Sequence, residues 1–430
     1  MKQNREVYDV IGVGIGPFNL SLAALLDTQE TKALFFEQKP EFAWHPGMLI
    51  EGTKLQVPFL ADLVTMADPT NPHSFLNYIS QQGRMYQFYI LQRLDIPRRE
   101  YNDYCKWASE RIGSCRFGKQ VTAVHGLQDG RHQVDVQDAS TGEVETFYTK
   151  HVVLGTGSTP ALPEAFQNMP REDVFHTADF EMQRQTCREA ESVTVVGSGQ
   201  SAAEAFRELL KEQRTCGFRL DWITRSPGFA SMEESKLNLE HFSPDYIDYF
   251  YPLPQEKKDE IFASQGLYYK GISEHTITDI YNLMYEYTVG REKIDVSLLP
   301  LTKVTGIERK EGRYELSCHH YQKEEGYSHR TDKVIVATGY QPNVPSFIKE
   351  LSDVIEFDDY GRYKVTKDYR LVNKGENAYN IFANSCIAHT HGVGSTNLGL
   401  AVFRSKVIVN QLLGKEVYPV QDSYVFQSFE

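Results

Sequence analysis

A strand, a glycine-rich turn and a helix near the start of the chain constrain its fold more than any other feature. The stretch VYDVIGVGIGPFNLSLAALL at residues 7–26 predicts a buried strand, a G-x-G-x-x-P turn and a helix of small and apolar residues. The turn contains Gly12, Gly14, Gly16 and Pro17. Backbone N–H groups and a helix N-terminus then point at one place, which suits the pyrophosphate of a dinucleotide. We expect the glycines to let the phosphate reach the backbone, since a Cβ there would block it.

An acidic residue about 20 positions further on is the second part of this pattern, because it binds ribose hydroxyls. Glu37 stands there, directly after a predicted strand over residues 33–36. Pro17 replaces the usual third glycine, so the first turn by itself also fits a plain tight turn in an α/β sheet.

The same pattern returns in the middle of the chain, and the repeat is more specific than either copy. Residues 192–196 are a β-rich run and residues 203–211 are predicted to be helical. The G-x-G-x-x-A turn between them consists of Gly197, Ser198, Gly199, Gln200, Ser201 and Ala202. Two nucleotide sites in one chain predict one bound flavin dinucleotide and one nicotinamide cofactor.

The strand after the second motif indicates which nicotinamide cofactor binds. Residues 220–224 end at Arg225, where an NADH-binding chain carries an acidic residue. A cation at this place pairs with a 2′-phosphate, so NADPH is favoured, although a plain surface arginine is the alternative.

These patterns predict an α/β fold with two Rossmann-like dinucleotide-binding domains, for FAD and NADPH, and a small helical substrate-binding insert. We assign residues 1–165 and 334–430 to the FAD domain, 166–230 and 286–333 to the NADPH domain, and 231–285 to the insert. Residues 56–59 are predicted to form a short strand, residues 165–190 an irregular segment, and residues 398–413 a final helix under the flavin.

Composition narrows the possible partners. The 430 residues carry a net charge of −13, which argues against nucleic acid or an anionic membrane as the main partner. The longest apolar run, residues 11–26, is too short to span a membrane. Scattered cysteines without zinc spacing predict no metal site, and polar residues 1–6 predict no signal peptide, so we expect a cytoplasmic protein.

Beyond these two turns, several segments together carry a family resemblance over nearly the whole chain. The chain resembles the N-hydroxylating flavin monooxygenases of hydroxamate siderophore synthesis, the lysine and ornithine N-monooxygenase family. The segments are GIGPFNLSLAAL, FFEQKPEFAWHPGM, LQVPF-x-ADL, DPTNPHSFLNYI, VVGSGQSAAE, VIVATGY and THGVGSTNLGL.

The resemblance implies which residues hold the cofactors. FAD would be bound by Gly12, Gly14, Gly16, Pro17, Glu37, Gln38, Lys39, Trp44, His45, Gln56, Val121, Thr396, Asn397 and Leu398. NADP would be bound by Gly197, Ser198, Gly199, Gln200, Ser201 and Arg225. The resemblance also implies a homo-oligomer, a dimer or a tetramer.

Two departures from the family pattern concern the substrate. Relatives that act on amino acids carry a lysine at the position of Ala61, where it pairs with the substrate carboxylate, and tend to carry a serine at that of Gly399. A carboxylate buried without a partner costs several kcal/mol. We therefore expect a substrate without a carboxylate, a linear diamine such as cadaverine or putrescine. L-Lysine held by other residues, as in an L-lysine N6-monooxygenase, is the alternative.

The side chain that would hold the far ammonium is less well defined. Asn238, Leu239 and Glu240 lie in the segment that forms the substrate pocket in the family, together with Glu234. For each of these residues, a solvated charge on the protein surface is as good an interpretation as a contact with the substrate. Nearby tyrosines offer cation–π contacts or ordinary core packing.

The implied reaction is N-hydroxylation of an amine by O2 through a C4a-hydroperoxide of the flavin, with NADPH as reductant. No catalytic triad or paired carboxylates are expected, because the cofactor carries the chemistry. Gln56 is expected to orient the flavin or nicotinamide, or else to be purely structural. An alkyl ammonium of pKa about 10.4 must lose its proton, so activity should rise with pH above neutrality. A disulfide-type flavin reductase is a rival function, but it needs a pair of redox cysteines near the flavin, which this sequence lacks. A non-catalytic NADP sensor is a second rival, but it would not need the aromatic segment that is expected to wrap FAD.

Overall fold

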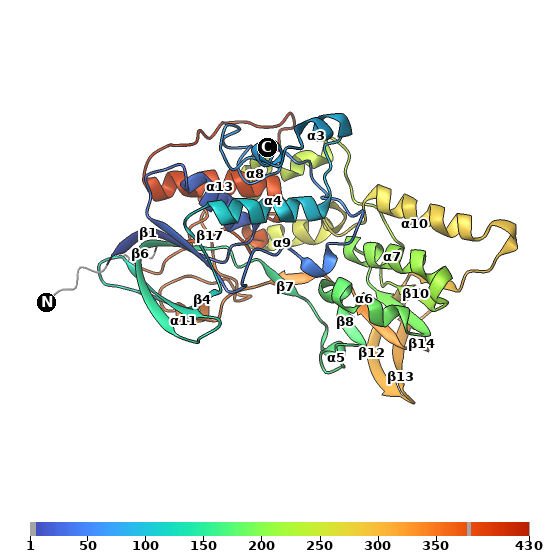
Figure 1. Cartoon of the computed structure of the whole chain (residues 1–430). Helices are drawn as coiled ribbons and strands as arrows, with labels where there is room; N and C mark the ends of the chain where they lie inside the picture. The colour runs from blue at the N-terminus through green and yellow to red at the C-terminus, as the bar shows by residue number, and fades with distance from the viewer. Residues whose placement is uncertain (1–5, 376–379, 430) are drawn as a thin grey trace.

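Two sheets, toward opposite ends of the molecule, organise the fold (Figure 1). The structure is a computed structural model that describes residues 6–375 and 380–429. The first sheet has seven strands in the order β3-β2-β1-β6-β5-β4, with β17 beside β6. Its strands are β1 Val7–Val13, β2 Ala33–Glu37, β3 Cys115–Phe117, β4 Lys119–Gly126, β5 His132–Asp138, β6 Val144–Leu154 and β17 Ile381–Ala383.

The second sheet has five parallel strands in the order β11-β10-β9-β15-β8. They are β8 Val174–His176, β9 Ser192–Val196, β10 Arg219–Ile223, β11 Val296–Leu299 and β15 Lys333–Val336. An antiparallel sheet of β12 Thr302–Lys310, β13 Arg313–His320 and β14 Glu325–Thr331 adjoins it. Between the two ends, β7 Ser158–Pro160 pairs with β16 Tyr340–Pro342 where the chain crosses over (Figure 1).

Helices cover both sheets. They are α1 Pro17–Leu26, α2 Phe75–Gln81, α3 Met85–Leu91, α4 Arg98–Arg111, α5 Glu164–Gln167, α6 Phe180–Arg188, α7 Gln200–Cys216, α8 Pro244–Phe250, α9 Gln255–Ser264, α10 Glu274–Tyr287, α11 Phe347–Glu350, α12 Ala388–His391 and α13 Leu398–Leu413. Short 3₁₀ turns are η1 Pro46–Met48, η2 Thr177–Asp179, η3 Asn238–Phe242, η4 Gly266–Tyr268, η5 Val289–Arg291 and η6 Val393–Thr396. No helix of the described ranges is both long enough and apolar enough to cross a membrane.

The central strand of each sheet is buried on both faces, as a parallel sheet covered by helices requires. Val10 and Ile11 of β1 and all five residues of β9 are buried. Helices α1 and α13 contact each other beside the first sheet, and α7 and α10 contact each other beside the second. The predicted fold class is confirmed, and the two glycine turns follow β1 and β9 as expected.

Two local predictions were wrong. Residues 165–190 are not irregular, because β8 and α6 lie there and β8 pairs with β15. Residues 56–59 form no strand, since they lie in a run of bends and turns. The final helix, α13, has the predicted bounds.

Candidate active site

The first glycine turn joins the end of β1 to the start of α1. Gly14 has a φ of +88°, and a Cβ there would lie 2.7 Å from the carbonyl oxygen of Gly155. A Cβ at Gly12 would lie 2.1 Å from the ring of Phe35. Contacts within the protein thus already exclude side chains at both positions. They explain the two glycines without the approach of a phosphate that was expected from the sequence. Gly16 caps α1 without a side-chain hydrogen bond and Pro17 is its first residue, so this helix N-terminus suits an anion.

The carboxylate of Glu37 holds the turn from the neighbouring strand. Its oxygens accept the backbone N–H of Ile15, at 3.0 Å, and of Lys39, at 3.1 Å. The structure therefore brings Glu37 to the turn, as the sequence predicts. Its role toward ribose hydroxyls stays a prediction.

The aromatic part of the expected FAD cradle lies where the two halves of the chain meet. His45 adopts a left-handed conformation, with φ of 49°, and its ring contacts those of Trp44 and Tyr340 edge-on. Burial, with the nearby Arg98 guanidinium, lowers the pKa of His45 to about 4, so it is neutral at pH 7. Gln38 and Lys39 are exposed beside this segment.

The remaining expected FAD residues come from two further places. Val121 is buried in β4 within the core of the first sheet. Asn397 caps α13 by accepting the backbone N–H of Gly399 at 2.8 Å, with Thr396 before it and Leu398 as the first helical residue. A helix N-terminus at this position can stabilise negative charge on a bound ring.

A buried chain of amides, which sequence reasoning missed, connects α13 with the first glycine turn. Asn19 donates to the carbonyl oxygen of Gly14 at 3.0 Å. Asn384, after β17, donates to the Asn19 side chain at 3.1 Å and accepts from Arg404 of α13 at 2.8 Å. The described residues thus fit an anionic dinucleotide, with a glycine turn, a helix N-terminus and a buried cation.

The second glycine turn follows β9. Gly197 has a φ of +140°, and a Cβ there would lie 2.2 Å from the carbonyl oxygen of Ala337. Gly199 caps α7 without a side-chain hydrogen bond. The hydroxyl of Ser198 lies 2.9 Å from that of Ser226, so the exposed Arg225 lies next to the turn, after β10. This arrangement suits a nucleotide with a 2′-phosphate.

The side chain of Gln200 bonds within the protein. It donates to Glu204 and to the hydroxyl of Thr276, and it accepts the backbone N–H of Ser273. Gln200 thus ties the start of α7 to that of α10, and Ser201 follows it in the first turn of α7. A direct contact of either side chain with NADP stays a prediction.

The two positions that depart from the family pattern lie side by side. A Cβ at Gly399 would lie 3.7 Å from the Cβ of Ala61, which is buried. They are far apart in sequence, so only the fold brings them together. The adjacent Asp62 is not free to bind a substrate ammonium. Its carboxylate already accepts three backbone N–H groups and the Thr65 hydroxyl.

The segment with Asn238, Leu239 and Glu240 lies beside η6, since a Cβ at Gly394 would be 3.5 Å from Phe242 Cα. Glu240 accepts the backbone N–H of Phe426, at 3.3 Å, and of Gln427, at 2.9 Å. This carboxylate therefore holds the end of the chain, a contact that sequence reasoning missed.

Asn238 donates to the hydroxyl of Ser235, and Leu239 is exposed. Gln56 is exposed, with its amide nitrogen 3.8 Å from the sulfur of Met232, which precedes this segment in the chain. Glu234 follows two residues later. Desolvation, with the neighbouring Glu274 carboxylate, raises the pKa of Glu234. No hydrogen bond or ion pair of Glu234 is found among the described residues.

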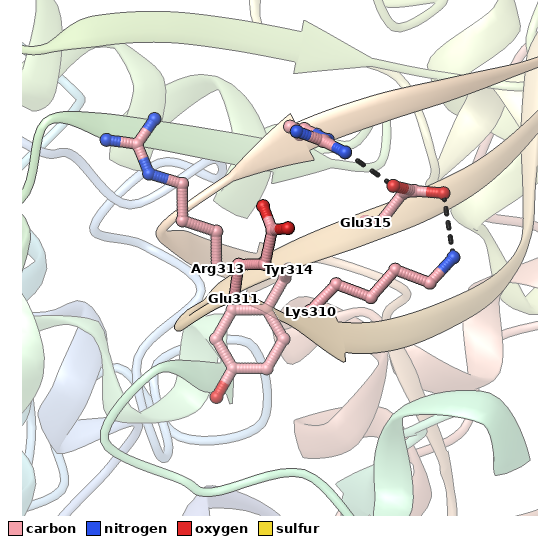
Figure 2. Close-up of a pocket in the computed structure, with 6 residues that line it drawn as sticks. Lys310, Glu311, Arg313, Tyr314 and Glu315 are labelled. Atoms are coloured by element: carbon pink, nitrogen blue, oxygen red, sulfur yellow. Dashed lines mark hydrogen bonds and ion pairs between the residues drawn. The ribbon is translucent and has the colours of Figure 1, made fainter.

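A separate hollow lies on the antiparallel sheet of β12, β13 and β14 (Figure 2). Glu315 there bonds Lys310 at 3.0 Å and Arg330 at 3.4 Å. The Glu315 carboxylate therefore already has partners, and neither glycine turn lines the hollow. We assign this hollow no part in the candidate active site.

Comparison with known proteins agrees with this geometry. The model of the family described as L-lysine 6-monooxygenase/L-ornithine 5-monooxygenase matches residues 6–342. A putrescine N-hydroxylase from Shewanella oneidensis is 40% identical over 430 residues, covering 99% of this chain and 85% of that protein.

Two solved structures are also similar. The FAD-bound cadaverine monooxygenase of the desferrioxamine pathway from Erwinia amylovora superposes with a TM-score of 0.95 at 39% identity, covering 99% of each chain. An ornithine N-hydroxylase from Kutzneria sp. 744, with reduced FAD, NADP+ and L-ornithine, has a TM-score of 0.88 at 28% identity, covering 95% of this chain and 99% of that one. The chain therefore belongs to the L-lysine 6-monooxygenase/L-ornithine 5-monooxygenase family, as its motifs predicted.

Proposed function

We propose that this protein hydroxylates one terminal amine of a linear diamine, cadaverine or putrescine, with O2, FAD and NADPH, as an early step of hydroxamate siderophore biosynthesis. The contact between Ala61 and Gly399 carries the proposal. Alanine and glycine offer no side-chain group that can bond a carboxylate, whereas the family resemblance implies a lysine, and in many cases a serine, at these positions in relatives that act on amino acids. The putrescine and cadaverine enzymes among its relatives support the same conclusion.

The protein's part in the reaction is binding and orientation. FAD would lie along the first glycine turn, Glu37, the Trp44–His45 segment and the start of α13, and NADPH along the second turn and Arg225. When bound, the flavin supplies the activated oxygen. The chain's residues hold the amine near it and exclude water.

The far ammonium of the diamine needs an anionic partner, and Glu234 fits best. Glu240 already binds two backbone amides, and the amide of Asn238 bonds Ser235. The side chain of Glu234 is exposed to an arriving ligand, and partial desolvation, with the nearby Glu274 carboxylate, raises its pKa. An arriving ammonium would stabilise its charged form.

Hydroxylamine formation with cadaverine, putrescine, L-lysine and L-ornithine tests the proposal directly. The FAD-loaded full chain with NADPH should turn over at least one diamine with a higher kcat/KM than either amino acid. Better turnover of L-lysine than of both diamines would overturn the substrate assignment and establish the protein as an L-lysine N6-monooxygenase. A protein that binds no FAD would overturn the enzyme assignment itself.

We further propose that the protein is a cytoplasmic homo-oligomer, a dimer or a tetramer, with α3 at a contact between copies. Helix α3 has no buried residue and exposes Tyr86, Tyr89 and Ile90 by 81%, 71% and 71%. An apolar surface of this kind is typical of an interface. Light scattering of the wild type and of Ile90→Glu should show a smaller assembly for the variant.

A further inference from the structure

The side chain of Arg404 is a buried cation without an anionic partner among the described residues. It is only 2% exposed, and its guanidinium forms no ion pair there. Its Nε donates to Asn384 at 2.8 Å and one Nη to the carbonyl oxygen of Ser395 at 3.1 Å, both of them neutral acceptors. Within residues 6–375 and 380–429, the other Nη has no hydrogen-bond partner, and neither has the buried hydroxyl of Ser395.

Other buried arginines of this chain are paired. Arg98 bonds Glu204, and Arg207 lies 3.2 Å from Asp279 and 3.3 Å from Glu208. A buried guanidinium without a carboxylate is strongly unfavourable in a low-dielectric interior. Burial accordingly lowers the pKa of Arg404 to about 10. The arrangement calls for negative charge that the described protein residues do not supply.

The position of Arg404 indicates where that charge would come from. Its guanidinium lies 4.8 Å from the ring centre of Phe18, the second residue of α1. Through Asn384 and Asn19 it is connected to the carbonyl oxygen of Gly14 in the first glycine turn. Arg404 therefore lies behind the helix N-terminus to which a diphosphate would bind.

We propose that Arg404 is the buried countercharge of the FAD diphosphate. The two negative charges of the cofactor offset the unpaired cation, and the Asn384–Asn19 chain fixes its place relative to the turn. This inference rests on the proposed FAD site. It adds to that site a residue outside the glycine motif, about a turn and a half into α13.

Titration of the FAD-free full chain with FAD, and separately with ADP, tests this role. Arg404→Gln removes the charge and keeps a side-chain donor, whereas Arg404→Lys keeps the charge. We expect Arg404→Gln to raise the dissociation constants of both FAD and ADP by about tenfold or more, and Arg404→Lys to raise them much less. ADP carries the diphosphate without the flavin. A similar loss of affinity for FAD and for ADP would therefore place the effect of Arg404 at the diphosphate.

Arg207→Gln is the matched control, because it removes a buried arginine that is already paired and lies in α7. It should lower the melting temperature and leave FAD affinity unchanged. An Arg404→Gln protein that binds FAD within twofold of the wild type, or that loses affinity for FAD only, would overturn the proposal. If Arg404→Gln does not fold, Arg404→Met takes its place, and failure of both to fold would assign Arg404 to the fold alone.

The wild-type titration separates this inference from the proposed function. A wild type that fails to bind FAD refutes the enzyme assignment. A wild type that binds FAD as tightly as the neutral Arg404 variants refutes only the countercharge.

Discussion

Arg98 and Glu204 form a buried, two-pronged ion pair between α4 and α7. The two guanidinium nitrogens lie 2.6 and 2.7 Å from the two carboxylate oxygens, and Glu204 is 1% exposed. Arg98 also donates to the carbonyl oxygen of Met48 at 2.9 Å, and Glu204 accepts from Gln200 of the second glycine turn. The pair thus joins the segment expected to wrap FAD to the helix expected to bind NADPH.

Breaking this pair should destabilise the protein and disturb NADPH binding. Arg98→Met leaves a buried carboxylate unpaired, which costs about 3–5 kcal/mol. Thermal unfolding should show a lower melting temperature, and steady-state kinetics a higher KM for NADPH, because the Glu204 carboxylate that accepts from Gln200 is no longer held in place. The double variant Arg98→Met with Glu204→Met should recover much of the stability. If the losses of stability in the two single variants simply add in the double variant, Arg98 and Glu204 are not energetically coupled.

The exposed pair Arg214–Glu292 is the matched control for this prediction. Its side chains are 48% and 58% exposed, and its ions lie 2.8 Å apart. Arg214→Met should cost less than about 1 kcal/mol and leave the KM for NADPH unchanged.

Ala61→Lys should weaken diamine turnover. The new ammonium would lie beside Gly399 and repel the cationic substrate, so the kcat/KM for cadaverine or putrescine should fall about tenfold or more. Ala61→Met has similar bulk without the charge and is the control. Equal losses in the two variants would show that space, and not charge, excludes the substrate.

Glu234→Gln should raise the KM for the diamine by about tenfold, because it removes the proposed partner of the far ammonium. NADPH-dependent flavin reduction without substrate should be unaffected. Glu233→Gln is the control, since that neighbouring carboxylate already accepts the backbone N–H of Ser235 at 3.0 Å. A KM that rises in Glu233→Gln and not in Glu234→Gln would contradict the assignment.

The end of the chain should support the substrate segment. The ring of Phe429 contacts those of His241, Tyr246 and Tyr249, while Phe426 is 98% exposed. Each aromatic contact contributes about 0.5–1.5 kcal/mol, so Phe429→Ala should loosen η3 and raise the KM for the amine several-fold. Phe426→Ala should match the wild type in the same kinetic assay. Identical KM values for both variants would leave the tail without a role in substrate binding.

Acid should destabilise the fold through His391. Burial lowers its pKa to about 3, below the value of about 6.5 in an unfolded chain. Between these pH values the unfolded chain binds a proton that the folded protein does not, so stability falls by about 1.4 kcal/mol per pH unit as pH falls. The melting temperature of His391→Gln should decline less than that of the wild type between pH 7 and pH 4.5.

His125→Gln is the comparison variant, because the side chain of His125 is 52% exposed whereas that of His391 is buried. His125→Gln should follow the wild-type curve. A His391→Gln curve parallel to the wild type would show that this histidine does not contribute.

Local patterns predicted the elements that carry the cofactor motifs. The turns after β1 and β9 and the helix α13 are encoded in short stretches whose periodicity and glycine spacing are visible in sequence. The three-residue strand β8 was missed because it is too short for periodicity and exists through its pairing with β15.

The sequence by itself determined the fold class, the family and the two nucleotide motifs, because each depends on residues close together in the chain. Only the tertiary structure decided that Ala61 faces Gly399, that Glu240 holds the C-terminal tail, and that one Nη of Arg404 is left without a hydrogen-bond partner among the described residues. Those relationships join positions tens to hundreds of residues apart. No local propensity encodes them, since they arise only when packing of the whole core brings distant segments into contact.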